Sequence, residues 1–125
     1  MEKLKKAALD TIEENKELIA SVADQIWEYA ELSLQEVRSA ALYCKMLKEL
    51  GFAVEEGICG IPTAFAASYG SGRPIIGILA EYDALSGLSQ LGGSIKKQEL
   101  TPGGTGHGCG HNLLGAGALA AALGI

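Results

Sequence analysis

Thr101-Pro-Gly-Gly-Thr-Gly-His-Gly-Cys-Gly-His-Asn112 is the segment that the surrounding elements are predicted to hold in place. Within it, His107, Cys109 and His111 alternate with glycine. In extended backbone, residues two apart project to the same side, and glycine, which lacks a Cβ, permits a tight turn around an ion. Imidazole nitrogen and thiolate sulfur are good ligands for zinc and its first-row neighbours. The segment therefore predicts one half of a metal site.

The residues after this segment predict a helix. Leu113 to Ile125 consists almost entirely of Ala, Leu and Gly, which is typical of a helix that is buried on all sides. We expect it to begin near His111 or Asn112, so that the helix dipole favours a thiolate at its start. Because this apolar helix runs to the last residue, we expect the chain to be a piece of something longer.

The residues before the segment predict a buried strand that ends in acids. Pro74 to Ala80 is a nearly continuous apolar run, as expected for a strand covered on both faces. Glu81 and Asp83 follow it, where α/β sheets commonly place ligands, although solvated acids that open a loop would give the same pattern. Ser86 to Thr105 has no clear period and predicts a long loop of the kind that often forms a lid.

The first half of the chain predicts two helices. Apolar residues recur at helical spacing from Glu2 to Glu31. A second helix is expected from Leu34 to Leu50. Ser33 and Glu36 form a capping box at its start, and Gly51 stands where a left-handed residue ends many helices.

Shorter elements follow these helices. Phe52 to Glu56 and Thr63 to Tyr69 predict strands, and Gly70 to Pro74 predicts a hairpin loop that leads into the buried strand. Two helices followed by strands indicate the α/β class, with helices packed on a mixed sheet.

Composition limits the possible functions. The chain of 125 residues is long enough for one domain or part of one, and 48% of it is hydrophobic. A net charge of −5 gives no support to nucleic-acid or anionic-membrane partners. The cysteines 44, 59 and 109 form no CxxC pair, so reduced thiols are expected. No apolar run reaches the roughly 20 residues of a membrane span, and the charged start does not resemble a signal peptide. A soluble cytoplasmic protein is expected.

Two motifs together resemble a known family. Gly106-His-Gly-Cys-Gly-His-Asn112, preceded by Ala80-Glu-Tyr-Asp-Ala-Leu85, resembles the amidohydrolase branch of peptidase family M-twenty, and within it the aminobenzoyl-glutamate hydrolase subgroup. The similarity extends through Trp27–Glu31, Gly60–Phe65 and Ala67–Gly72. It implies that residues 1–125 are the N-terminal portion of a zinc-peptidase catalytic domain of the phosphorylase/hydrolase-like fold, with a dimerisation domain beyond Ile125.

The resemblance also implies roles for individual residues. Cys109 and His111 match ligands of a two-metal centre. Asp83 matches the acid that orients a metal-bound group, and it is the expected catalytic residue. His107 and Asn112 are possible substrate or metal contacts.

The implied activity is metal-assisted hydrolysis of the amide bond in N-acyl or aryl-acyl amino acids or dipeptides. The cofactors would be two divalent ions of zinc, manganese, cobalt or nickel, and the full-length protein would be a homodimer. Glu81 stands where relatives carry another acid or a histidine ligand, and it is left unassigned. In the family the glutamate base lies after the Cys/His loop, whereas no acid follows Glu99 in this chain. We therefore expect the chain alone to be inactive.

Two other functions remain open at this point. Cys109 could be the nucleophile of a hydrolase, activated by His107 or His111; such an enzyme would survive treatment with a chelator. Alternatively, the loop could belong to a metal-binding module without catalytic activity.

Overall fold

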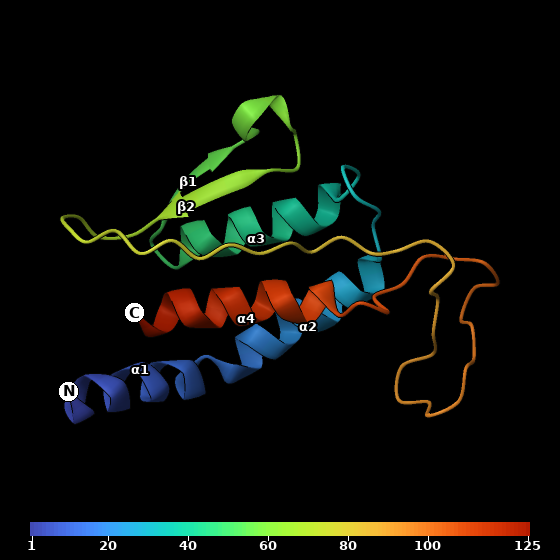
Figure 1. Cartoon of the computed structure of the whole chain (residues 1–125), viewed down its shortest axis with the longest axis horizontal. Coiled ribbons are helices and arrows are strands. Elements are labelled where there is room, and N and C mark those ends of the chain that lie inside the picture. Colours follow the sequence, from blue (N-terminus) through green and yellow to red (C-terminus); the bar gives the residue numbers. More distant parts are fainter.

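The computed structural model describes residues 1–125 and shows four α-helices packed on a two-stranded sheet (Figure 1). The α/β class is therefore confirmed, with a sheet of two antiparallel strands. The elements in chain order are α1 (Glu2–Glu14), α2 (Lys16–Tyr29), α3 (Val37–Glu49), β1 (Ala53–Glu56), the 3-10 turn η1 (Ile58–Gly60), β2 (Phe65–Ser68) and α4 (His111–Gly124).

None of these helices combines the length and the apolar character that crossing a membrane requires.

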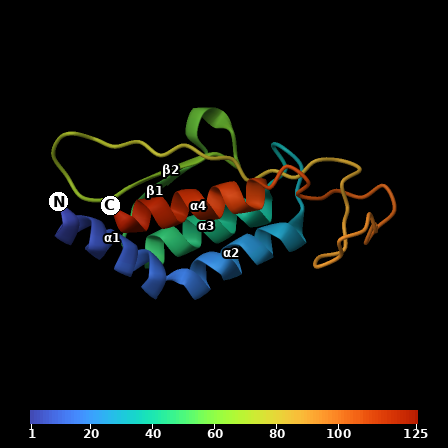
Figure 2. The same cartoon turned by 60° about the horizontal axis from the view of Figure 1, so that its bottom comes forward.

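The core lies where α2, α3 and α4 meet. Figures 1 and 2 show α4 lying along the other helices, with the hairpin of β1 and β2 on the side of α3. Six buried side chains form the central cluster: Val22, Ile26, Tyr43, Met46, Leu47 and Leu119. Burying each large apolar side chain contributes roughly 1.5–3 kcal/mol. Because α4 supplies Leu119, this core fixes the position of the helix that carries His111.

The prediction of a single helix from Glu2 to Glu31 is wrong in one respect, because the structure has two helices with a break at Asn15. Asn15 has φ −99° and ψ 7° and lies between α1 and α2. Its side-chain amide donates a hydrogen bond to the Thr11 carbonyl over 2.8 Å. Asparagine side chains that bond to nearby backbone compete with the regular helical pattern, and here the result is a bend between two helices.

The expected capping box does not form. The third helix begins at Val37, not Leu34, and neither Ser33 nor Glu36 makes a capping hydrogen bond. Glu31 takes this role: its carboxylate accepts bonds from the backbone N–H of Arg38 and of Ser39, each over 2.9 Å, and from the Ser39 hydroxyl. A carboxylate also suits the positive end of the helix dipole.

The end of the third helix agrees with the prediction. Gly51 has φ +88° and follows Leu50, the residue that caps the C-terminal end of α3. A residue with a Cβ is strained in this left-handed conformation. The glycine therefore lets the chain turn from α3 into β1.

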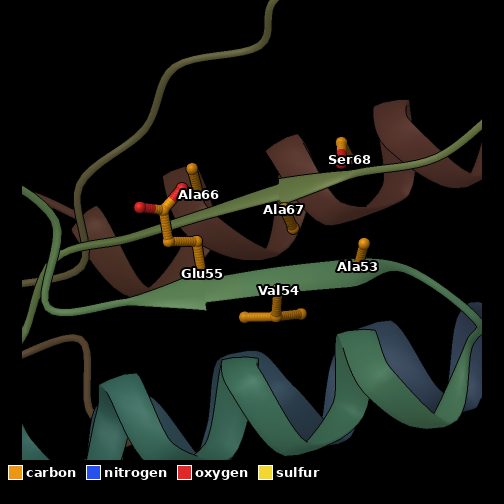
Figure 3. Close-up of a pocket in the computed structure, with 6 residues that line it drawn as sticks. All are labelled: Ala53, Val54, Glu55, Ala66, Ala67 and Ser68. Carbon is orange, nitrogen blue, oxygen red and sulfur yellow. The ribbon is translucent and has the colours of Figure 1, made fainter.

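The hairpin presents its two faces to different surroundings. Val54 pairs with Ala67, and both point toward α3 in Figure 3. Glu55 and Ala66, which pair in the next register position, point to the opposite side and are exposed. This alternation is typical of an antiparallel sheet with one face on the core.

The expected buried strand from Pro74 to Ala80 is wrong. These residues form no sheet, and Ile75 and Leu79 are 79% and 94% exposed. The hairpin loop expected at Gly70 to Pro74 consequently joins β2 to an extended segment that runs past the helices (Figure 1). An apolar run indicates a strand only where another strand supplies hydrogen-bonding partners, and the sheet contains only β1 and β2.

Two predictions about the last third of the chain can be compared with the structure. Residues 86–105 form a long loop without helix or strand, as expected, and it projects beyond the helices in Figures 1 and 2. The last helix starts at His111, also as expected. The prediction that this helix is buried on all sides is wrong, because Leu113 and Leu114 are 65% and 44% exposed. The face with Gly115 and Leu119 is the buried one.

Candidate metal centre

The centre of the site is His111, the first residue of α4, which has a carboxylate near each ring nitrogen. Its Nδ1 lies 3.0 Å from Asp83 Oδ1, and its Nε2 lies 3.6 Å from Glu81 Oε1. Only the first distance is that of a hydrogen bond. The structure thus brings together three residues from two segments that are far apart in the sequence.

The Asp83 carboxylate identifies which nitrogen of His111 donates a hydrogen bond. A carboxylate oxygen accepts, so Nδ1 carries the hydrogen that is donated to Asp83. In neutral imidazole the other nitrogen is then unprotonated and has a free lone pair. Metal-binding histidines commonly donate their second nitrogen to a carboxylate in this way, which fixes the ring and raises its basicity. The Asp83–His111 pair therefore fits a metal centre with Nε2 as the ligand atom.

Backbone bridges hold the acidic segment against the loop. The N–H of Ala84, next to Asp83, donates to the Glu31 carbonyl over 2.7 Å. Leu85 and Gly106 exchange two hydrogen bonds of 3.0 Å each. These bonds tie the residues after Asp83 both to the end of α2 and to the loop that leads to His111.

Tyr82 anchors the same segment from the other side. Its hydroxyl donates to the Thr63 carbonyl, just before β2. Its ring lies 5.2 Å from that of Tyr43 and 6.0 Å from that of Phe65, centroid to centroid. Burial raises the pKa of Tyr82 above its usual range, with the nearby Glu36 charge adding to the effect. Tyr82 thus remains a neutral hydrogen-bond donor.

His107 has a different environment from His111. It is 4% exposed, and its Nε2 lies 3.0 Å from the Ile26 carbonyl, so Nε2 carries a hydrogen and donates it. Burial lowers its pKa, and the hydrogen bond to Ile26 opposes that shift only in part. The ring is therefore neutral and its Nδ1 is an acceptor, buried and without a partner. In this structure His107 fastens the loop to α2.

Asn112 makes a similar attachment. Its side-chain amide donates to the Ala23 carbonyl over 3.2 Å, and its Oδ1 is buried without a partner. Asn112 and His107 line a hollow of about 380 Å³, together with Trp27, Asp24 and Leu113. A role in substrate contact stays a prediction for both residues.

Cys109 lies exposed on the loop between the two histidines. It makes no hydrogen bond to either imidazole, since His107 bonds to Ile26 and His111 to Asp83. The arrangement therefore does not favour a thiol nucleophile activated by histidine. No three His, Cys, Asp or Glu side chains converge closely enough to hold an ion by themselves. The donor types present, imidazole, carboxylate and thiol, nevertheless suit zinc and its neighbours.

A second hollow, of about 270 Å³, lies on the hairpin (Figure 3). Half of its lining residues are alanines from β1 and β2, and Glu55 is the one ionisable residue. Its one hydroxyl, on Ser68, has no imidazole beside it in the lining, so the hollow is not a candidate active site.

Two of the positioning residues were missed by sequence analysis. Glu31 lies at the end of a helical pattern, and its only sequence signal is an acid placed shortly before another helix. Tyr82 stands between the two acids, and its only sequence signal is an aromatic ring with a hydroxyl, which commonly anchors a segment when it is buried.

Comparisons with known proteins agree with the motif resemblance. The chain is 47% identical over 116 residues to a subunit of the p-aminobenzoyl-glutamate hydrolase of Escherichia coli (strain K12), and the match covers 93% of this chain and 24% of that protein. It is 30% identical over 136 residues to the mouse Xaa-Arg dipeptidase, covering 100% of this chain and 27% of that protein. Thermostable carboxypeptidase 1 of Saccharolobus solfataricus is 32% identical over 114 residues, covering 90% and 27% respectively. No family model matches the chain.

The chain thus spans about a quarter of the length of these curated relatives. The match to the dipeptidase covers the whole chain, so it includes both the Ala80–Leu85 and the Gly106–Asn112 motifs. The chain is therefore related by sequence to the amidohydrolases and peptidases of family M-twenty, as its motifs indicate.

Proposed function

We propose that this chain carries part of the active site of a metal-dependent hydrolase that cleaves the amide bond of N-acyl or aryl-acyl amino acids or dipeptides. The observation that carries the proposal is the Asp83–His111 hydrogen bond, which in a neutral imidazole leaves the Nε2 lone pair free at the start of α4. Its support from sequence is the similarity to a p-aminobenzoyl-glutamate hydrolase and to peptidases. The first observation supports a metal site, and the similarity supports hydrolysis of an amide.

The chain's own residues have distinct tasks in this proposal. His111 presents Nε2, Asp83 holds the ring and its tautomer, and Cys109 is the second expected ligand from the same loop. A bound divalent ion would polarise the scissile carbonyl and lower the pKa of a bound water. His107 and Asn112 hold the loop against α2, so that the ligands are fixed before the ion binds.

The chain lacks a residue suited to be the general base after its metal loop. No Asp or Glu follows Glu99, and catalytic zinc sites normally use three protein ligands and a water. We therefore propose that residues 1–125 form the N-terminal portion of the catalytic domain and do not catalyse hydrolysis alone. Cytoplasmic location and a full-length homodimer stay predictions.

An activity assay tests both parts of the proposal. A protein that carries this segment in a chain of the relatives' length is expected to release free amine from p-aminobenzoyl-glutamate or another N-acyl amino acid, and dialysis against a chelator should abolish the release. Residues 1–125 should show no turnover with or without zinc or manganese. Hydrolysis that survives the chelator would contradict the metal proposal, and turnover by the short chain would show that it contains the base.

A further inference from the structure

We propose that the segment from Arg73 to Glu81 binds the same segment of a second copy of this chain, as two antiparallel strands related by a twofold axis at Gly77. Residues 73–81 are called the docking segment below. In Figure 1 this segment runs past the helices, outside the sheet of β1 and β2. The inference concerns association of the chain and does not depend on the metal centre.

The backbone of the docking segment has no partner within the chain. None of its N–H or C=O groups takes part in a backbone–backbone hydrogen bond, and the sheet contains only β1 and β2. An extended backbone with unpaired N–H and C=O groups is a template for a strand from another chain. A second copy can therefore supply the ladder of hydrogen bonds that this apolar run lacks.

The large side chains inside the docking segment are apolar and exposed. Their exposed fractions range from 41% to 94%, and they belong to Ile75, Ile76, Ile78 and Leu79. Single exposed hydrophobic residues are ordinary, whereas a contiguous run of them marks an interaction site. Isoleucine also favours the strand conformation. Pairing with another strand would thus remove apolar surface from water and satisfy the backbone at the same time.

The charges at the two ends set the direction and the register of the pair. Arg73 and Glu81 each lie four residues from Gly77, and no charged residue stands between them. In an antiparallel pair centred on Gly77, Arg73 of each copy lies opposite Glu81 of the other, so both ends of the ladder gain an opposite-charge pair. A parallel pair in register would place like charges opposite each other, which is unfavourable. Arg73 is exposed, and the Glu81 side chain is 58% exposed beside His111, so both are open to the other copy.

The same register suits the remaining residues. It places apolar side chains opposite one another across the axis, Ile75 with Leu79 and Ile76 with Ile78. Antiparallel pairs alternate between hydrogen-bonded and non-hydrogen-bonded positions. When Gly77 exchanges hydrogen bonds with Gly77 of the other copy, Pro74 falls three residues away at a non-hydrogen-bonded position, where a missing N–H is no loss. Each copy contributes the same surface, so the interface closes as a dimer.

Sedimentation velocity of the chain over a range of concentrations tests this pairing. The wild type is expected to dimerise. Arg73→Glu and Glu81→Arg should each weaken the dimer by about fivefold or more, because like charges then meet at both ends of the ladder. The double variant makes every end pair opposite in charge again and should return the dissociation constant to within about twofold of the wild type. Lys97→Glu, an exposed change of the same charge in the long loop, is the control and should have no effect.

Gly77→Pro tests the ladder separately from the charges. Proline removes the N–H at the twofold axis in both copies, so this variant should be monomeric at concentrations where the wild type is a dimer. Circular dichroism confirms that each variant is folded. A wild type that stays monomeric up to about 1 mM would overturn the inference and leave a strand from a different protein segment as the occupant. A dimer that tolerates Gly77→Pro, or that the double charge variant does not restore, would also overturn it, because association would then use another surface or register.

Discussion

The two halves of the glycine-rich loop contain the same residue types and serve different purposes. In the first half, Gly106 and His107 are buried against Leu88 and α2. In the second half, Gly110 has open space around it, and His111 faces two carboxylates near solvent. The difference teaches that a histidine four residues from another can be structural while its neighbour is available for chemistry. Burial and the partner of each nitrogen decide between the two roles.

The largest effect is expected at Gly106. A Cβ added there would lie 2.0 Å from the Leu88 carbonyl oxygen, and backbone cannot move aside as a side-chain end can. We expect Gly106→Ala to lower the free energy of unfolding by about 3–4 kcal/mol, measured by urea denaturation. Gly110→Ala should lower it by only about 1–2 kcal/mol, because the strain there comes solely from φ +76°.

Gly92→Ala is the control for this pair, since Gly92 has open space and no positive φ. It should leave stability within about 0.5 kcal/mol of the wild type. Equal losses at Gly106 and Gly110 would contradict the division of the loop into a packed and an open half.

The next effect separates the two histidines. His107→Ala removes a buried ring and leaves the Ile26 carbonyl without its donor, so we expect a loss of about 2–3 kcal/mol in unfolding free energy. His111→Ala should cost less than about 1 kcal/mol, because that ring is partly exposed. Thermal and urea unfolding measure both. A larger loss of stability in His111→Ala than in His107→Ala would contradict the assignment of His107 as the structural histidine.

A smaller effect concerns the orientation of His111. Asp83→Asn removes the carboxylate that accepts the hydrogen of Nδ1. Loss of such a partner weakens metal binding by about 10- to 100-fold, and we expect this range for zinc by competition with a chromophoric chelator. Asp10→Asn, an exposed change on α1, is the control. Unchanged affinity in Asp83→Asn would show that His111 needs no orienting acid.

The smallest effect lies behind the site, at Tyr43. Its hydroxyl is buried without a hydrogen-bond partner, and burial, followed by repulsion from Tyr82, raises its pKa above the usual value near 10. The stability that the protonated form provides is therefore complete below about pH 10 and is lost as pH rises toward the raised pKa.

Tyr43→Phe should be neutral or stabilising by up to about 1 kcal/mol at pH 7, because it removes an unsatisfied polar group. It should also reduce the loss of stability above about pH 10. Urea unfolding at pH 7 and pH 10.5 measures both effects. A clear destabilisation at pH 7 would show that the hydroxyl has a partner after all.

Local signals in the sequence were sufficient for several elements. The change to an Ala/Leu/Gly pattern placed the start of α4 at His111, and Gly51 correctly predicted the end of α3, because both depend on nearby residues. The acids 81 and 83 were selected by their position after an apolar run. Their contact with His111 joins residues 28 apart in the sequence, so spacing alone could suggest it but could not supply the distance.

Other features depend on partners that spacing does not reveal. Ser33 and Glu36 fit a capping box, yet Glu31 reaches the N-terminus of α3 from eight residues before Ser39. The apolar run at 74–80 has the composition of a buried strand, but a strand forms only against a neighbour. His107 and His111 are equivalent as sequence letters, and only the fold shows that one of them donates to the Ile26 carbonyl.

The most direct measurement is the tautomer of His111, read from the two ring-nitrogen resonances in a long-range ¹H–¹⁵N NMR spectrum of the chain near neutral pH. The structure predicts a hydrogen on Nδ1, donated to Asp83, and a shift of the Nε2 resonance when zinc is added, while the His107 resonances stay in place. A hydrogen on Nε2 and a bare Nδ1, or an Nε2 resonance that ignores zinc, would contradict the account.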